Sequence, residues 1–219
     1  MTDRPSASIS SRKEPRQVRS TGLVAAILDA AIQVLAKDGA QRFTTARVAE
    51  RAGVSVGSLY QYFPNKAAIL FRLQSDEWRR TADLLRDILE DTSKPPLARL
   101  RALVHAFVRS ECEEAEIRGA LDDAAPLYRD APEAQEAKRS GDRAVAAFMK
   151  EVLPGAPEAE RALVGGLIAM TLSAAGKAFS ERPRTEAEIE TFAGALADMY
   201  CAYLGGLAER GSAAGGGEG

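Results

Sequence analysis

The chain has 219 residues, of which 46% are apolar and only 6% aromatic. This length allows one large domain or two small ones. The two cysteines, Cys112 and Cys201, are too far apart in the sequence to suggest a disulfide framework or a zinc site, so a reducing cytoplasm is expected. The net charge of −2 is unevenly distributed, because residues 1–74 carry +6 and residues 75–219 carry −8. Such a basic N-terminal third is expected where one end of a protein meets phosphate.

The first 19 residues show no periodicity and no apolar core, which predicts a disordered basic arm rather than a signal peptide. Its arginines and lysine could reach the minor groove of DNA or remain solvated. A second disordered segment is expected over 209–219, where glycine is frequent. Between these ends apolar residues recur at helical spacing and no run alternates long enough for a strand. The sequence therefore predicts an all-α fold, with helices over 21–37, 44–52, 55–62, 66–93, 97–112, 114–121, 132–153, 158–179 and 186–204.

The most membrane-like stretch is 162–179. It contains Thr171, Ser173 and Lys177 and is barely long enough to span a bilayer. A buried helix in a protein without membrane association is therefore expected here. Enzymatic activity is not expected either, because the chain has one histidine, no glycine-rich phosphate loop after a strand and no nucleophile motif.

Two short helices meet at the corner Ala52-Gly53-Val54-Ser55. Gly53 can supply the left-handed backbone that a tight corner needs, and Thr44 and Ser55 can cap the two helices. An α-helix fits the major groove, and small residues at its N-terminus let its backbone approach the bases. The second helix is therefore predicted to read bases through its exposed side, which carries Val56, Gly57, Ser58 and Gln61.

Hydroxyl groups and one lysine around this helix suit phosphate oxygens, namely those of Thr45, Tyr60, Tyr62 and Lys66. Purely structural roles compete with these predictions. Tyr60 could be a half-buried core tyrosine, Tyr62 is expected to pack in part against the domain, and Lys66 could be an ordinary solvated lysine. Gly57 could be small for groove access or for close helix packing.

The run from Phe43 to Lys66 resembles the signature of the TetR family of transcriptional regulators, as do the preceding Ile27-Leu28-Asp29-Ala30-Ala31 and Gly39. The resemblance covers about residues 20–72. A helix-turn-helix corner alone is common, and the pattern Leu59-Tyr60-x-Tyr62-Phe63-x-x-Lys66 makes the match specific. Ala67 and Ala68 depart from the many relatives that have an acidic residue soon after the lysine.

This resemblance implies a three-helix DNA-binding domain over 20–66 and a larger helical domain for ligand binding and dimerisation over 67–208. It implies a homodimer that binds a palindromic operator in double-stranded DNA. The dimer would repress transcription until a small-molecule effector releases it, without a metal or cofactor. The family's base and phosphate contacts carry over onto the residues named above.

The body has no motif, so its candidate residues are chosen by residue type. Gly165 and Gly166 lie in one predicted helix with several alanines, which would allow close helix approach and predicts a four-helix dimer interface with the last helix. Candidate pocket residues are Trp78, His105, Phe107, Arg109, Phe148, Met149 and Met170. Each has a competing structural role: His105 could be an ordinary core or surface histidine, and Arg109 could pair with a neighbouring glutamate.

Two alternatives to a ligand-released repressor stay open. The first is a helical ligand-binding protein that has lost DNA binding, which the intact Thr45, Tyr60, Tyr62 and Lys66 argue against. The second is an activator, or a regulator without a ligand. The sequence does not separate activation from repression, because the sign of regulation depends on where the operator lies.

Overall fold

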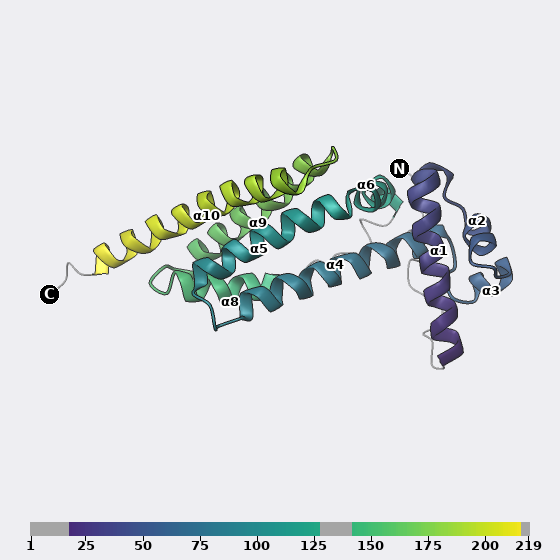
Figure 1. The fold of residues 1–219 in the computed structure, drawn as a ribbon. Coiled ribbons are helices and arrows are strands. Elements are labelled where there is room, and N and C mark those ends of the chain that lie inside the picture. Colours follow the sequence, from purple (N-terminus) through teal and green to yellow (C-terminus); the bar gives the residue numbers. More distant parts are fainter. Residues whose placement is uncertain (1–17, 128–141, 216–219) are drawn as a thin grey trace, which may run out of the picture. The chain divides into compact units, whose positions relative to one another are not determined.

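A computed structural model of the chain describes residues 18–127 and 142–215 (Figure 1). In these two ranges the regular elements are all helices, which confirms the all-α prediction. They are α1 (Val18–Arg42), α2 (Thr45–Arg51), α3 (Val56–Tyr60), α4 (Lys66–Glu90), α5 (Pro96–Glu113), α6 (Ala115–Ala124), the 3-10 turn η1 (Ala125–Leu127), α8 (Asp142–Val152), α9 (Glu158–Ser180) and α10 (Glu186–Gly215).

The two outermost helices are longer than the sequence pattern predicts. Helix α1 begins at Val18, inside the predicted arm, and continues to Arg42 across a break at Gly39, whose φ is 70°. Helix α10 continues beyond the expected end at Leu204 to Gly215, so the predicted disorder over 209–219 is wrong for residues 209–215. Leu207 and Ala208 still pack against an apolar core, which gives the helix a reason to continue. The predictions for residues 1–17, 132–141 and 216–219 lie outside the described residues.

The chain divides into two compact units. Of the described residues, the first unit comprises 18–79 and 116–127, and the second comprises 80–115 and 142–215. The described part of the first unit contains α1, α2, α3, the N-terminal part of α4, and α6 with η1. Its core is built from every one of these helices, and its most deeply buried side chains are Ile27, Leu35, Phe43, Val48, Leu59, Phe63, Ile69, Leu70 and Leu121.

An ion pair is buried beside this core. Arg118 of α6 lies 2.8 Å from Glu77 of α4, and their side chains are only 13% and 7% exposed. The side-chain amide of Gln74 also donates a hydrogen bond to Glu77, at 3.1 Å. A buried carboxylate needs such partners, because an unpaired charge in an apolar interior is strongly unfavourable. The pair therefore fixes α6 against α4 within the first unit.

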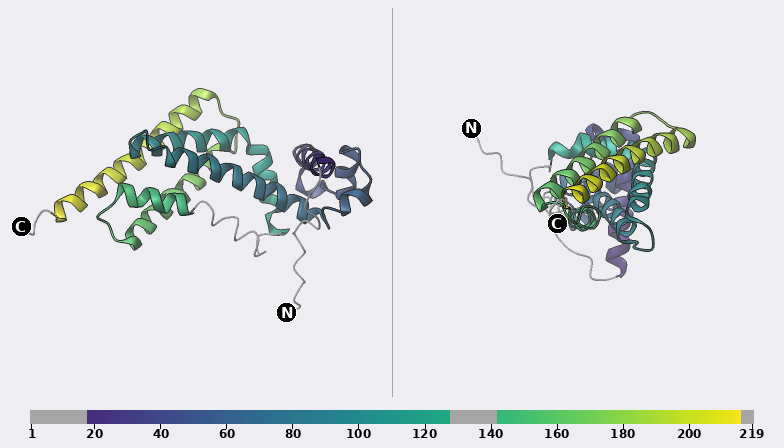
Figure 2. Two further views of the ribbon diagram at one scale, coloured as in Figure 1. Left: turned by 90° about the horizontal axis from the view of Figure 1, so that it is seen from below. Right: turned by 90° about the vertical axis from the view of Figure 1, so that its left-hand side faces the viewer.

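The second unit is a helical bundle in which α5 packs against both α9 and α10, and α8 packs against α9 (Figures 1 and 2). Its core joins the C-terminal part of α4 with α5, α8, α9 and α10. The most completely buried side chains include Val104, Val108, Ala193, Ala197 and Leu204.

One charged residue, Arg99, is 2% exposed in this second unit. Its guanidinium donates hydrogen bonds to the backbone carbonyl of Leu89 and to Glu151, and lies 5.6 Å from the centre of the Phe148 ring. These partners belong to the ends of α4 and α8. Arg99 thus ties the start of α5 to two other helices of the unit.

The buried ion pair of the first unit gives a stability prediction. Replacing Arg118 with methionine leaves Glu77 buried without its charged partner, so the free energy of unfolding should fall by about 3–5 kcal/mol. The double variant Arg118→Met/Glu77→Leu should recover much of that loss, since no charge then remains buried. Urea unfolding followed by circular dichroism measures both changes. A loss below about 1 kcal/mol in the single variant would contradict the assigned role of the pair.

Candidate functional site

The corner between α2 and α3 has the geometry that the sequence predicts. Gly53 adopts a φ of 68°, in the left-handed region that glycine occupies without strain. The amide of Gly53 donates to the carbonyl of Glu50 at 3.1 Å, and the amide of Val54 donates to that of Ala49 at 3.0 Å. These bonds close the end of α2 and turn the chain sharply into α3.

Side-chain caps define where the helices of this region begin. The Thr44 hydroxyl accepts a hydrogen bond from the amide of Arg47 at 3.3 Å, and the Ser55 hydroxyl accepts one from the amide of Ser58 at 3.0 Å. The side-chain oxygen of Asn65 accepts from the amide of Ala68 at 2.9 Å and caps α4. Each cap pairs an amide at a helix N-terminus that has no partner within the helix.

Helix α3 has one buried and one exposed side. Leu59 is fully buried in the first core, whereas Val56, Gly57 and Gln61 are exposed and Ser58 is half-buried. A Cβ atom added at Gly57 would meet only the Ser55 hydroxyl, at 3.8 Å. Close packing inside the described part of the chain therefore does not require glycine at this position, and groove access for Gly57 stays a prediction.

The four predicted phosphate-binding residues differ in exposure. The hydroxyl groups of Thr45 and Tyr60 lie 3.1 Å apart and join α2 to α3 at the surface. Lys66 is exposed and is the first residue of α4. Tyr62 is only 7% exposed and belongs to the first core, so most of its ring has a structural role. A phosphate contact through the remaining exposed part of Tyr62 stays a prediction.

Two arginines fix α2 against α1, and sequence reasoning missed both. Arg47 forms an ion pair with Asp38 at 3.0 Å, and Arg51 donates to the side-chain oxygen of Gln33 at 2.6 Å. In the sequence these arginines look like ordinary exposed charges on a short helix. Their partners lie on another helix, so only the fold identifies them.

The second unit contains a cavity of about 250 Å³. Four helices supply its walls, each through residues at helical spacing. The lining residues are Ala82, Leu85, Arg86 and Leu89 of α4, Leu100, Leu103 and Phe107 of α5, Ala144, Val145, Phe148 and Met149 of α8, and Gly165, Ile168, Ala169 and Leu172 of α9. Three predicted pocket residues, Phe107, Phe148 and Met149, thus lie on this cavity. Among these lining residues Arg86 alone is charged.

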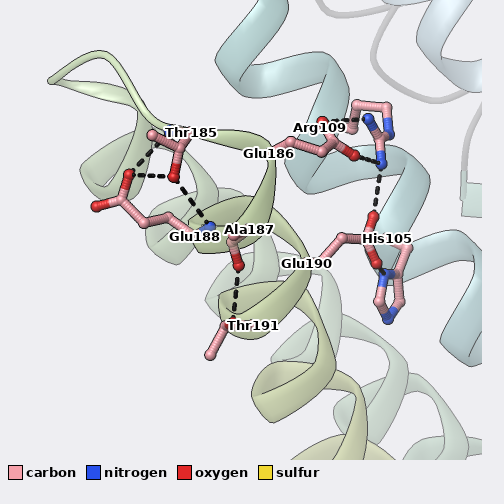
Figure 3. A network of polar contacts seen from close by, with 8 residues as sticks. All are labelled: His105, Arg109, Thr185, Glu186, Ala187, Glu188, Glu190 and Thr191. Carbon is pink, nitrogen blue, oxygen red and sulfur yellow. Dashed lines mark hydrogen bonds and ion pairs between the residues drawn. The ribbon is translucent and has the colours of Figure 1, made fainter.

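The other four predicted pocket residues lie elsewhere. His105 and Arg109 point from α5 towards α10, where Nδ1 of His105 lies 3.0 Å from Glu190 and Arg109 pairs with Glu186 and Glu190 (Figure 3). The hydrogen bond from Arg109 lowers the pKa of Glu186. Met170 is 65% exposed, and Trp78 belongs to the first unit. His105 and Arg109 thus lie on the side of α5 that contacts α10, whereas Leu103 and Phe107 are on the side of α5 that lines this cavity.

Helix α9 is apolar on more than one side. By length and composition α9 could cross a membrane. Only 28% of its most apolar 18-residue stretch is buried inside the chain, so the expectation of a buried helix is wrong. Leu163 is 72% exposed, and Leu167 and Met170 are exposed as well. Gly165 faces inward, where an added Cβ would lie 3.0 Å from Val145 and 3.1 Å from Met149. Its small size serves the contact between α8 and α9 within the chain.

Comparison with known protein families agrees with the fold and with the helix-turn-helix corner. Residues 27–73 match the family model for bacterial regulatory proteins of the tetR family, and residues 95–207 match that for the tetracyclin repressor-like C-terminal domain. The two models together account for the helix-turn-helix corner and for most of the second unit. The chain belongs to the TetR family of bacterial regulatory proteins.

Individual relatives are more distant. The chain is 30% identical over 131 residues to the HTH-type transcriptional repressor KstR of Rhodococcus jostii, and the match covers 58% of this chain and 60% of KstR. It is 32% identical over 74 residues to the fatty acid metabolism regulator protein of Bacillus subtilis, covering 33% of this chain and 38% of that protein. The structure of FadR from Bacillus subtilis in complex with stearoyl-CoA has a similar fold, with a TM-score of 0.62, 16% identity and coverage of 82% and 96% of the two chains.

The left-handed corner gives a second stability prediction. Alanine at position 53 would meet no atom within 4 Å, so its cost is that of the backbone conformation alone. Gly53→Ala should lower the free energy of unfolding by about 1–2 kcal/mol. Gly119→Ala is the matched control, since it lies in helix α6 with equally open space and should raise stability by about 0.5–1 kcal/mol. Urea midpoints that move in the same direction for both variants would refute the prediction.

Proposed function

We propose that this protein is a dimeric DNA-binding repressor that a small molecule releases from its operator. In this proposal α3 enters the major groove. Val56, Gly57, Ser58 and Gln61 contact base edges, and Thr45, Tyr60, Tyr62 and Lys66 contact phosphates. The observation that carries the proposal is the exposure of the N-terminus of α3 beside the Thr45–Tyr60 pair, with no internal packing need for Gly57. The charge of +6 over residues 1–74 favours the same partner.

Base and phosphate contacts follow from different chemistry. The Gln61 amide can bond both donor and acceptor atoms of adenine, and the Val56 methyl groups can touch the methyl group of thymine. Lys66 offers a positive charge at the N-terminus of α4, where backbone amides also favour anions. These groups would fix the position of the protein on DNA, while α3 distinguishes the sequence.

Homodimerisation follows from the exposed apolar side chains of α9 and α10. These are Leu163, Leu167 and Met170 of α9 and Met199 and Tyr203 of α10. Large exposed apolar side chains that recur along two helices favour an interface over a solvated surface. Two copies related by a twofold axis would present two α3 helices to successive major grooves, about 34–36 Å apart, which requires a palindromic operator.

The effector site in this proposal is the cavity of the second unit. A ligand there would favour one conformation of the dimer and so change its affinity for DNA, by no more than its own difference in affinity for the two conformations. Relatives named as a transcriptional repressor and a fatty acid metabolism regulator support regulation of transcription as the general role. A protein acting on bacterial DNA in this way would work in the cytoplasm.

The proposed DNA contacts are tested by selecting bound duplexes from a random pool with the full chain. A palindromic sequence should be enriched, and the absence of any enriched palindrome would overturn the proposal.

On the selected site, Lys66→Ala should weaken binding to all sequences alike and reduce the salt slope by about 1. Gln61→Ala should instead relax preference at one base pair, by about 1–3 kcal/mol. Fluorescence anisotropy at several salt concentrations separates the two effects.

The proposed dimer interface is tested by placing a charge on the exposed face of α9. Leu163→Asp should shift the full chain from dimer to monomer at micromolar concentration, because a carboxylate would be buried in the interface without a partner. Leu84→Asp is the control, since Leu84 is also exposed but lies on α4. Multi-angle light scattering measures the mass of each. A monomeric parent protein, or dimers of both variants, would count against this interface.

A further inference from the structure

We propose that the cavity of the second unit binds the hydrocarbon tail of an amphiphile with an anionic head, such as a fatty acid or its coenzyme A thioester, and that Arg86 meets the head. This assignment rests on the proposed role of the cavity as the effector site. It follows from the chemistry of the fifteen lining residues, of which Arg86 alone carries a charge.

The inner part of the cavity offers no partner for a polar ligand group. Nine of its lining residues are buried, and all nine are apolar: Leu89, Leu100, Leu103, Phe107, Phe148, Met149, Gly165, Ile168 and Leu172. A hydroxyl or amide placed among them would lose its bonds to water without replacement. The buried portion of the ligand is therefore hydrocarbon.

The remaining lining residues form the rim, where a head group can stay hydrated. Ala82, Leu85, Ala144 and Val145 are half-buried there, whereas Ala169 and Arg86 are exposed. The Arg86 guanidinium lies 2.7 Å from Asp83 and 3.8 Å from Asp87, both on the same helix. Such exposed pairs are weak, at a few tenths of a kcal/mol each. A guanidinium has five donor N–H groups, so a ligand carboxylate or phosphate can bind beside or in place of Asp83.

A cationic ligand fits this cavity poorly. No carboxylate is among the lining residues. Of the two aromatic rings on the cavity wall, Phe107 and Phe148, the ring of Phe148 already has the buried guanidinium of Arg99 beside it. A second positive charge near that ring would be repelled in a low-dielectric interior. The arrangement of apolar floor and single cation at the rim thus fits an anionic amphiphile bound with its tail inward.

The size of the cavity limits the tail. At about 250 Å³ it is slightly smaller than the roughly 300–1,000 Å³ that is usual for ligand-binding pockets. Gly165 contributes to this limit, because α8 and α9 approach so closely there that a methyl group would press on Val145 and Met149, both lining residues. We therefore expect affinity to rise with chain length and then level off once the tail fills the cavity.

The test is isothermal titration calorimetry on the full chain with straight-chain acids of six to twelve carbons and with the matching primary alcohols. Affinity for the acids should rise about fourfold per methylene until it levels off. Each acid should bind about tenfold more tightly than its alcohol, because only the acid forms charge-assisted bonds with Arg86. Equal affinity of acid and alcohol, or no dependence on chain length, would overturn the proposal.

Two pairs of variants separate the head contact from the tail contact. Arg86→Gln should lower affinity for the acid about tenfold and leave affinity for the alcohol unchanged. Arg80 is an exposed arginine on the same helix but outside the cavity, so Arg80→Gln should change neither affinity. Ala144→Phe should abolish binding of the longest tails by filling the cavity, and Ala146→Phe on the exposed side of α8 should not. If Arg86→Gln binds the acid as tightly as the parent chain, the head assignment is wrong.

A third comparison identifies whether the ligand is the free acid or its coenzyme A thioester. Decanoyl-CoA and decanoate present the same tail with different anionic heads, and the tighter binder identifies thioester or free acid as the ligand. Binding of neither would overturn the proposal. Operator binding is measured on the same preparation. A chain that binds DNA but no amphiphile refutes only the ligand class, whereas one that binds the amphiphile but no DNA refutes only the proposed function.

Discussion

The candidate DNA interface depends on one left-handed residue, Gly53. Because the chain turns there, the amide of Val54 can bond back to α2 and the Ser55 hydroxyl can cap α3. Helix α3 has five residues, which is too short to be stable alone, so its position is set by this corner and by burial of Leu59. The exposure of Val56, Gly57 and Gln61 is a consequence of those constraints. The corner thus fixes which side of α3 faces outward before any DNA binds, and this side is the one proposed to contact bases.

Each unit adds a buried arginine that restricts how its helices can move. In the first unit, sliding α6 along α4 would separate Arg118 from Glu77 and break an ion pair that is largely shielded from water. In the second unit, Arg99 holds the end of α4 and the end of α8 through Leu89 and Glu151. Apolar contacts alone tolerate small shifts, because one hydrocarbon neighbour replaces another at little cost. The ion pairs do not, and so they select particular arrangements among the many that the apolar faces allow.

Local sequence signals predicted local structure well. The caps at Thr44, Ser55 and Asn65 and the turn at Gly53 are each determined by neighbouring residues, so the helix-turn-helix corner could be read from the sequence. Contacts between distant residues could not. Nothing near Arg118 shows that its partner is Glu77, and nothing near Arg109 shows that its partners are Glu186 and Glu190. Residue type alone therefore identified three cavity residues, Phe107, Phe148 and Met149, but misplaced Trp78, His105, Arg109 and Met170.

Helix α9 combines two tasks that explain its unusual composition. Gly165, Ile168, Ala169 and Leu172 line the cavity, while Leu163, Leu167 and Met170 are exposed and belong to the proposed dimer interface. A helix with one apolar stripe can serve a single contact, so one that serves two must be apolar nearly all round. Two such contacts would explain why α9 is apolar enough to cross a membrane although much of it is exposed in the single chain. The same double role of α9 would place the ligand and the dimer partner on one helix. A tail that pushes against α9 from the cavity acts on the same helix that would hold the partner, so ligand binding can alter the dimer without a long chain of intermediate contacts.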